Sequence, residues 1–150
     1  MKVLRCALAA GAFCAATLPV SALAGECPEE HRLTEPRELD QVGGAGVDTV
    51  VREQITLTEW RDMGNFRLRM RHFVIAPGGT VANHSHGDRP AIIYFVEGEI
   101  LEHNAYCAEP ILHKAGETSA EFGDAHRHWW SNESDSPVVL VSSDVVPFKP

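Results

Sequence analysis

Positive charge is scarce in this sequence. Thirteen of its 150 residues are Lys or Arg, against 21 Asp or Glu, which leaves a formal net charge of −8 with neutral histidines. Nucleic acids and anionic lipid surfaces are bound through clusters of basic residues, so we expect neither as a partner. An acidic surface of this kind keeps a protein in solution and indicates little about its substrate.

Several signatures of catalysis and folding are also missing. The sequence has no GxSxG nucleophile elbow, no glycine-rich loop for phosphate and no cysteine-rich zinc framework. It also has no internal repeat, no low-complexity tract and no long amphipathic helix. These absences argue against a serine hydrolase, a nucleotide-binding protein, a zinc finger and a helical or repeat architecture.

Long apolar runs are confined to the N-terminus. Lys2 and Arg5 precede an apolar stretch over residues 6–20, and Ala-Leu-Ala at 22–24 precedes Gly25, which is the order of a cleavable secretory signal. We therefore assign residues 1–24 to a signal peptide. No later segment approaches the roughly 18 apolar residues that span a bilayer. The sequence thus predicts a periplasmic or secreted protein with no membrane attachment after cleavage.

Cysteine is rare in the mature chain. Two of the four cysteines lie in the signal peptide, and Cys27 and Cys107 remain. An oxidising compartment favours a disulfide between them, which stabilises by about 4 kcal/mol in the chain-entropy model. Such a bond would hold an N-terminal arm, residues 25–48, to the connection at 104–110. The alternatives are two unpaired thiols or thiols that join a metal site.

The mature sequence consists of short segments typical of strands, separated by glycine and proline turns. In the second segment, the alternation from Phe66 through His72 to Val74 predicts an apolar inner face, and Pro77 is expected to break the run. The nearly all-apolar segment 91–96 is typical of a strand buried on both faces. The pattern predicts an all-β sandwich or barrel that forms a single domain over residues 49–150. The irregular arm before this domain is expected to contain one short helix in residues 36–40. The expected strands are 49–59, 66–76, 91–96, 100–103, 126–130 and 137–146.

Two histidine pairs stand out within this pattern. His84 and His86 lie in HSH, and His126 and His128 lie in HRH about forty positions later. Residues separated by one position on a strand point to the same face. A third imidazole from a neighbouring strand would then complete one face of a transition-metal site.

These residues resemble the motifs of the cupin superfamily. Its first motif, G(x)5HxH(x)3-4E(x)6G, is matched by Gly78, His84, His86 and Gly98, but Pro90 or Ala91 stands where the glutamate belongs. In the second motif, G(x)5PxG(x)2H(x)3N, the matching residues are Gly116, His128 and Asn132, while the PxG element has become Gly-Asp-Ala with a change of one residue in length. The resemblance covers residues 66–146 and implies a single-domain jelly-roll barrel.

The resemblance also implies a metal site. His84, His86 and His128 match the family's three histidine ligands, and the carboxylate ligand is absent from its motif position. The outcome is either a three-histidine site or a barrel that has lost tight metal binding. Imidazole suits several divalent transition metals, and we take Fe(II) as first choice, with Mn, Ni, Cu or Zn as alternatives.

Three further residues are candidates for a role in catalysis. His126 would share the face of His128 and serve as a fourth ligand or a proton carrier, or it sits at the barrel mouth. His72 is either a pocket residue or a core histidine. Arg89 would clamp a substrate carboxylate, or pair with Asp88 or Asp124.

The remaining aromatic and imidazole side chains have simpler expected places. The histidines outside these groups are expected to be solvated, and Trp129 and Trp130 must face opposite ways on a strand, so at most one lines the cavity. The solvated histidines are His31, His103 and His113.

Three functions follow from these residues. The first is a metal-dependent oxygenase, such as a dioxygenase, acting on a small organic molecule. The second is a metal-dependent lyase or isomerase, and the third is a cupin that binds a metal or small molecule without turnover. A homodimer is also expected from the exposed edges of a small sandwich.

Overall fold

The computed structural model describes residues 26–149, so the predicted signal peptide lies outside the described residues. A 3-10 helix, η1 (Glu29–His31), opens the arm, and residues 36–40 form no helix, contrary to expectation. Six strands follow. They are β1 (Ala45–Thr56), β2 (Phe66–Glu97), β3 (Glu99–Asn104), β4 (Ile111–Lys114), β5 (Thr118–Ser131) and β6 (Val138–Pro147). All their pairings are antiparallel, and the all-β jelly roll predicted from the sequence is confirmed.

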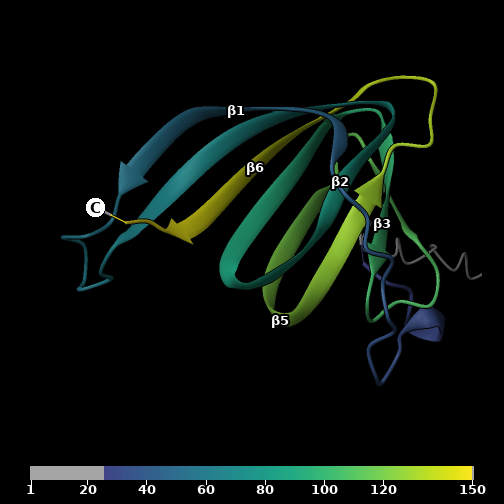
Figure 1. The fold of residues 1–150 in the computed structure, drawn as a ribbon, viewed down its shortest axis with the longest axis horizontal. Coiled ribbons are helices and arrows are strands. Elements are labelled where there is room, and N and C mark those ends of the chain that lie inside the picture. The colour runs from purple at the N-terminus through teal and green to yellow at the C-terminus, as the bar shows by residue number, and fades with distance from the viewer. Residues whose placement is uncertain (1–25, 150) are drawn as a thin grey trace, which may run out of the picture.

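The long strand β2 organises the barrel. Its first part, near Ile75, pairs with one edge of β6, and its last part, from Ala91, pairs with the other edge. Its middle part and the residues from Ala91 to Tyr94 pair with β5, and β1 lies along its first part (Figure 1). The expected break at Pro77 does not occur, because β2 continues as one bent strand with register shifts.

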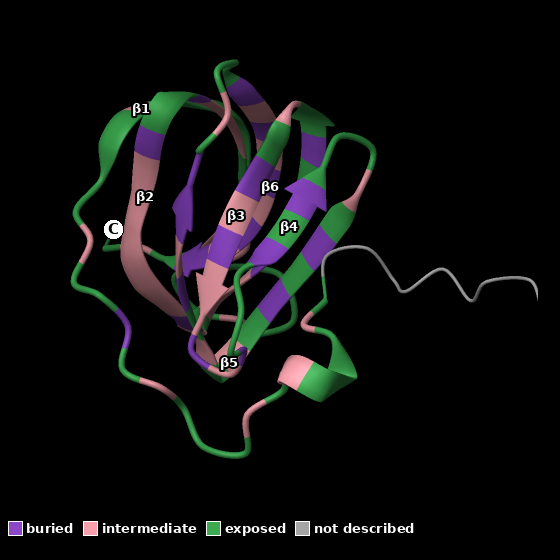
Figure 2. Ribbon diagram, turned by 90° about the vertical axis from the view of Figure 1, so that its right-hand side faces the viewer, coloured by how far each residue is buried: buried purple, intermediate pink, exposed green. Residues whose placement is uncertain are grey.

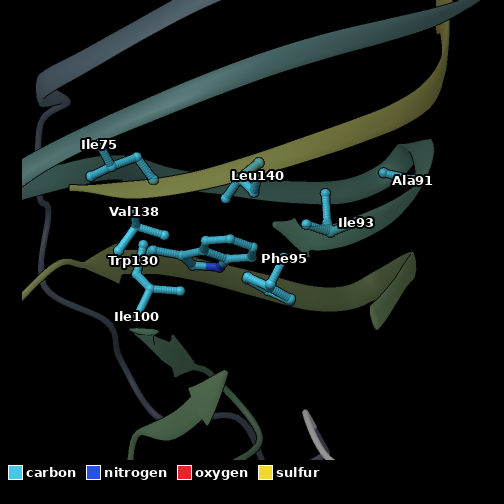
Figure 3. Packing of buried hydrophobic residues seen from close by; sticks show 8 residues of the cluster. All are labelled: Ile75, Ala91, Ile93, Phe95, Ile100, Trp130, Val138 and Leu140. Carbon is cyan, nitrogen blue, oxygen red and sulfur yellow. The ribbon is translucent and has the colours of Figure 1, made fainter. Parts of the chain in front are cut away.

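The core lies between the two layers of strands. Figure 3 shows its side chains facing one another from β2, β6 and β5, and Figure 2 shows buried and exposed residues alternating along β4 and β5. This alternation is the normal result of covering one face of a sheet. The buried cluster contains Ile75, Ala91, Ile93, Phe95, Ile100, Trp130, Val138 and Leu140.

Two faces differ from the sequence prediction. Leu68 and Met70 are 37% and 42% exposed, whereas Arg71 and Phe73 line an internal cavity, so the inner face of this segment is the opposite one. The segment 91–96 is buried on one face only, because Ile92 is 62% exposed. A buried carboxylate explains the first difference. Asp144 on β6 accepts hydrogen bonds from Arg69 and Arg71, which allows the arginines to face inward.

The arm is fixed to the barrel by a covalent bond. Cys27 and Cys107 form the predicted disulfide. Backbone hydrogen bonds add to it, since Arg37 donates to Ala105 and Asn83 donates to Val42. The arm therefore reaches the middle of β2, next to the first histidine pair. Among the described residues, no helix has the length and apolar character needed to cross a membrane.

Candidate metal centre

Three histidine rings converge inside the barrel. His84 and His86 lie on β2, and His128 on β5 is the cross-strand partner of His84. The Nε2 atom of His84 lies 3.0 Å from that of His86 and 3.2 Å from that of His128, and the remaining pair is 3.2 Å apart. Nitrogens that bind one ion at about 2.0–2.1 Å lie about 3 Å from each other. The triangle therefore has the dimensions of a ligand set.

The other ring nitrogen of each histidine is occupied. His84 Nδ1 donates to the carbonyl of Ala82, and His86 Nδ1 donates to the carbonyl of Arg89, each at 2.8 Å. Neutral rings held in this way present Nε2 lone pairs to the centre of the triangle. Burial, followed by the nearby imidazoles and Arg89, lowers the pKa of His84 to about 4, so this ring is neutral at ordinary pH.

Glu102 on β3 fixes the third ring. Its Oε1 accepts a hydrogen bond from His128 Nδ1 at 2.8 Å, and its Oε2 accepts one from His113 Nε2 at 2.8 Å. Burial alone would raise the pKa of Glu102, but the hydrogen bonds from His113 and His128 and the nearby His126 ring lower it well below its usual range. Trp130 Nε1 also lies 2.9 Å from His128 Nδ1. The anionic carboxylate decides the tautomer, because a charge-assisted hydrogen bond is roughly twice as strong as a neutral one. A carboxylate behind a histidine ligand is a common support for metal binding.

A second carboxylate lies beside the triangle. Glu121 on β5 is buried, its Oε2 is 3.0 Å from His86 Nε2, and its Oε1 is 4.0 Å from His128 Nε2. The first motif lacks its glutamate, as the sequence indicates, but the Glu121 carboxylate lies next to the three histidines. The described residues hold one cluster of three histidines and a second of Glu102, His126 and His128 that could hold a metal ion. The histidine cluster is compatible with metal binding.

Comparisons with known proteins place the fold. No protein-family model and no curated protein sequence matches the chain. Among solved structures, the polyketide cyclase RemF from Streptomyces resistomycificus is similar over 79% of this chain and 73% of its own, with 15% identity and a TM-score of 0.55. A sugar phosphate isomerase from a cupin superfamily, from Silicibacter pomeroyi, matches over 70% of this chain with 16% identity and a TM-score of 0.50. This chain has the cupin fold.

The cupin domain of a transcriptional regulator from Enterobacter cloacae is a further match, with 15% identity over 70% of this chain and 100% of its own, and a TM-score of 0.49. This chain covers only 61% of the isomerase chain. At these identities the similarity shows the fold alone, and the functions of the similar proteins differ from one another.

The cavity beside the three histidines is lined by one of the three additional candidates. Arg89 lines the cavity with His84 and His86, and its Nε is buried without a hydrogen-bond partner among the described residues. Asp88 and Asp124, the alternative partners, are both exposed. Arg89 thus keeps a free donor beside the three histidines.

His126 and His72 lie elsewhere. His126 shares the face of His128, with ring centroids 4.7 Å apart, but it lines a different and larger cavity beyond Glu102. Burial alone would lower its pKa, but Glu102 and Glu121 raise the pKa of His126 overall. Its Nε2 stays 3.4 Å from Glu102 Oε1 and forms no regular hydrogen bond. His72 lies on the strand face opposite to Arg71 and Phe73, so it does not line the cavity of the three histidines.

Three residues of this region differ from the sequence prediction or are absent from it. His113, expected to be solvated, is 0% exposed and stacks on Phe95. Glu102 lies outside the motifs, but its place two positions after the buried Ile100 on a strand puts it on the inner face. Glu121 also lies outside the motifs, seven residues before His128 on the same strand. Of the tryptophans, Trp130 lines the cavity and Trp129 stacks on His103 outside it, as the alternation predicts.

Proposed function

We propose that this cupin binds one divalent transition-metal ion through His84, His86 and His128. The observation that supports this proposal best is the convergence of three Nε2 atoms whose rings are all held by their Nδ1 atoms. Three lone pairs that face one another repel, and a shared cation removes this repulsion. Fe(II) is our first choice, and Mn, Ni, Cu or Zn would fit the same donors.

The substrate that we propose is a small organic anion. The cavity beside the rings has a volume of about 40 Å³, room for about three water molecules. Arg89 and Arg71 line it, and Arg71 is also paired with Asp144. Arg89 therefore binds the carboxylate of the substrate as a planar, bidentate donor.

The reaction that we propose is an oxygenation of this small molecule. When bound, the ion would supply Lewis acidity or, for Fe and Mn, redox chemistry with dioxygen. Arg89 orients the substrate, the apolar wall with Phe73 and Trp130 excludes water, and Glu102 keeps the proton of His128 on Nδ1. The alternative is a lyase or isomerase reaction. The disulfide favours this alternative, because an oxidising compartment offers little reductant to maintain Fe(II).

A measurement of metal binding distinguishes these proposals from a barrel that has lost its metal site. We expect purified protein to hold one transition-metal ion, and added Mn(II) or Zn(II) to raise the melting temperature of the metal-free protein. His84→Ala should abolish both effects, and His72→Ala, a histidine on the opposite strand face, should leave them intact. Equal metal responses in wild type and His84→Ala would refute the site.

Turnover separates the enzymatic proposals. Oxygen consumption by the metal-loaded protein with small carboxylates would support the oxygenase, and product formation without oxygen consumption would support the lyase or isomerase. Metal binding without any turnover would favour a binding protein.

Export to the periplasm or secretion is part of the proposal, supported by the disulfide between Cys27 and Cys107. A homodimer stays a prediction.

A further inference from the structure

Glu121 is a buried carboxylate whose pairing is incomplete. It is 2% exposed, and its Oε1 has no hydrogen-bond partner among the described residues. A buried charge without partners is costly, so an orphaned carboxylate oxygen in a core requires an explanation.

The groups that face Glu121 do not supply the missing partner. His86 Nε2 lies 3.0 Å from Oε2, and His128 Nε2 lies 4.0 Å from Oε1. Both rings donate through Nδ1, to the carbonyl of Arg89 and to Glu102. In neutral rings the carboxylate therefore faces two lone pairs, an arrangement of acceptor against acceptor. A cation bound between the carboxylate and the two rings would make both contacts favourable.

The strand register explains why the carboxylate comes from β5. Ala91 on β2, one of the two positions where the first motif would place its glutamate, is the cross-strand partner of Glu121. Directly opposed residues on an antiparallel pair have Cβ atoms about 5 Å apart and share a face. The methyl group of Ala91, 6% exposed, leaves the space beside it to the longer side chain.

We propose that Glu121 is the fourth ligand of the metal, taking across the strand pair the place that the motif glutamate would take from Ala91. This inference rests on the proposed metal site and adds a carboxylate to its three imidazoles. The metal ligands would then be three histidine nitrogens and one carboxylate oxygen. The carboxylate would bring one negative charge into direct contact with the ion.

Moving the carboxylate from Glu121 on β5 to position 91 on β2 tests the inference. Zn(II) and Mn(II) affinities are measured by competition with a chromophoric chelator, for wild type, Glu121→Gln and the double variant Ala91→Glu/Glu121→Ala. We expect Glu121→Gln to bind at least tenfold more weakly and the double variant to recover most of this loss. Glu97→Gln, an exposed carboxylate at the end of β2, is the matched control and should bind as wild type does.

The outcomes separate the two proposals. If wild type binds neither ion, the proposed function fails. If wild type binds and folded Glu121→Gln binds equally well, the three-histidine site stands and the fourth ligand is refuted. A loss in Glu121→Gln that the double variant does not recover at all would refute the exchange between the two strands.

A second variant covers the case in which Glu121→Gln does not fold. Glu121→Asp keeps the buried charge but withdraws it by one methylene, and we expect it to lose at least tenfold in affinity and to change the visible spectrum of the Co(II)-loaded protein. Unchanged affinity and spectrum would refute the inference.

Discussion

Removing the carboxylate behind His128 should weaken metal binding in a graded way. Glu102 accepts hydrogen bonds from His128 and His113, and Asn104 Nδ2 donates to its Oε1 at 2.9 Å. In Glu102→Gln, Asn104 would select the orientation with the amide oxygen at the Oε1 position. The bond from His128 would survive, the negative charge would be lost, and the amide NH₂ would face His113.

The expected losses follow from this difference. Removing the outer partner of a histidine ligand costs about 10- to 100-fold in metal affinity, or about 1.4 to 2.7 kcal/mol. We place Glu102→Gln near the lower end and Glu102→Ala near the upper end, because alanine removes both the charge and the acceptor that fixes the tautomer of His128.

Competition with a chromophoric chelator for Zn(II) measures both variants, and near-ultraviolet circular dichroism checks that they are folded. Glu99→Gln, an exposed carboxylate on the same strand, is the control. Affinities within twofold of wild type for both folded Glu102 variants would refute the supporting role. A loss in Glu102→Gln as large as that in Glu102→Ala would refute the orientation that we assign to the amide.

Three further predictions concern stability. Asp144→Asn should lower the free energy of unfolding by about 3 to 5 kcal/mol, because two arginines lose a fully buried partner; a loss below about 1 kcal/mol in urea melts would contradict this. Reducing the Cys27–Cys107 disulfide should cost about 4 kcal/mol, seen as a lower melting temperature with reductant, and an unchanged temperature would contradict it. Metal-free protein should lose up to about 3 kcal/mol between pH 6.5 and 4, since unfolded His84 takes up its proton at the higher pH and folded His84 only near pH 4; a slope equally steep in His84→Ala would contradict this.

The histidine positions were predictable because they depend on local rules. His84 and His86 share a face wherever β2 is extended, and one cross-strand pairing brings His128 beside them. The strand content and the disulfide were predictable for similar reasons.

The carboxylates and the inner face of β2 were not predictable in this way. Which side chain faces the cavity depends on the register between strands, and a pattern within one strand does not determine it. Arg69 and Arg71 face inward because Asp144, some seventy residues later in the chain, neutralises them. Glu121 reaches the three histidines because its partner across the ladder is the small Ala91.

The pairing of β2 with β5 sets when the chain can first bring its three clustered histidines together. His84 and His128 are 44 positions apart and meet only across this ladder. A nascent chain that ends before His128 has two of the three imidazoles and lacks the third. Bringing residues so distant in sequence together costs loop-closure entropy and slows folding. Occupancy of the proposed metal site would thus require that β2 and β5 have paired, and would report a closed barrel.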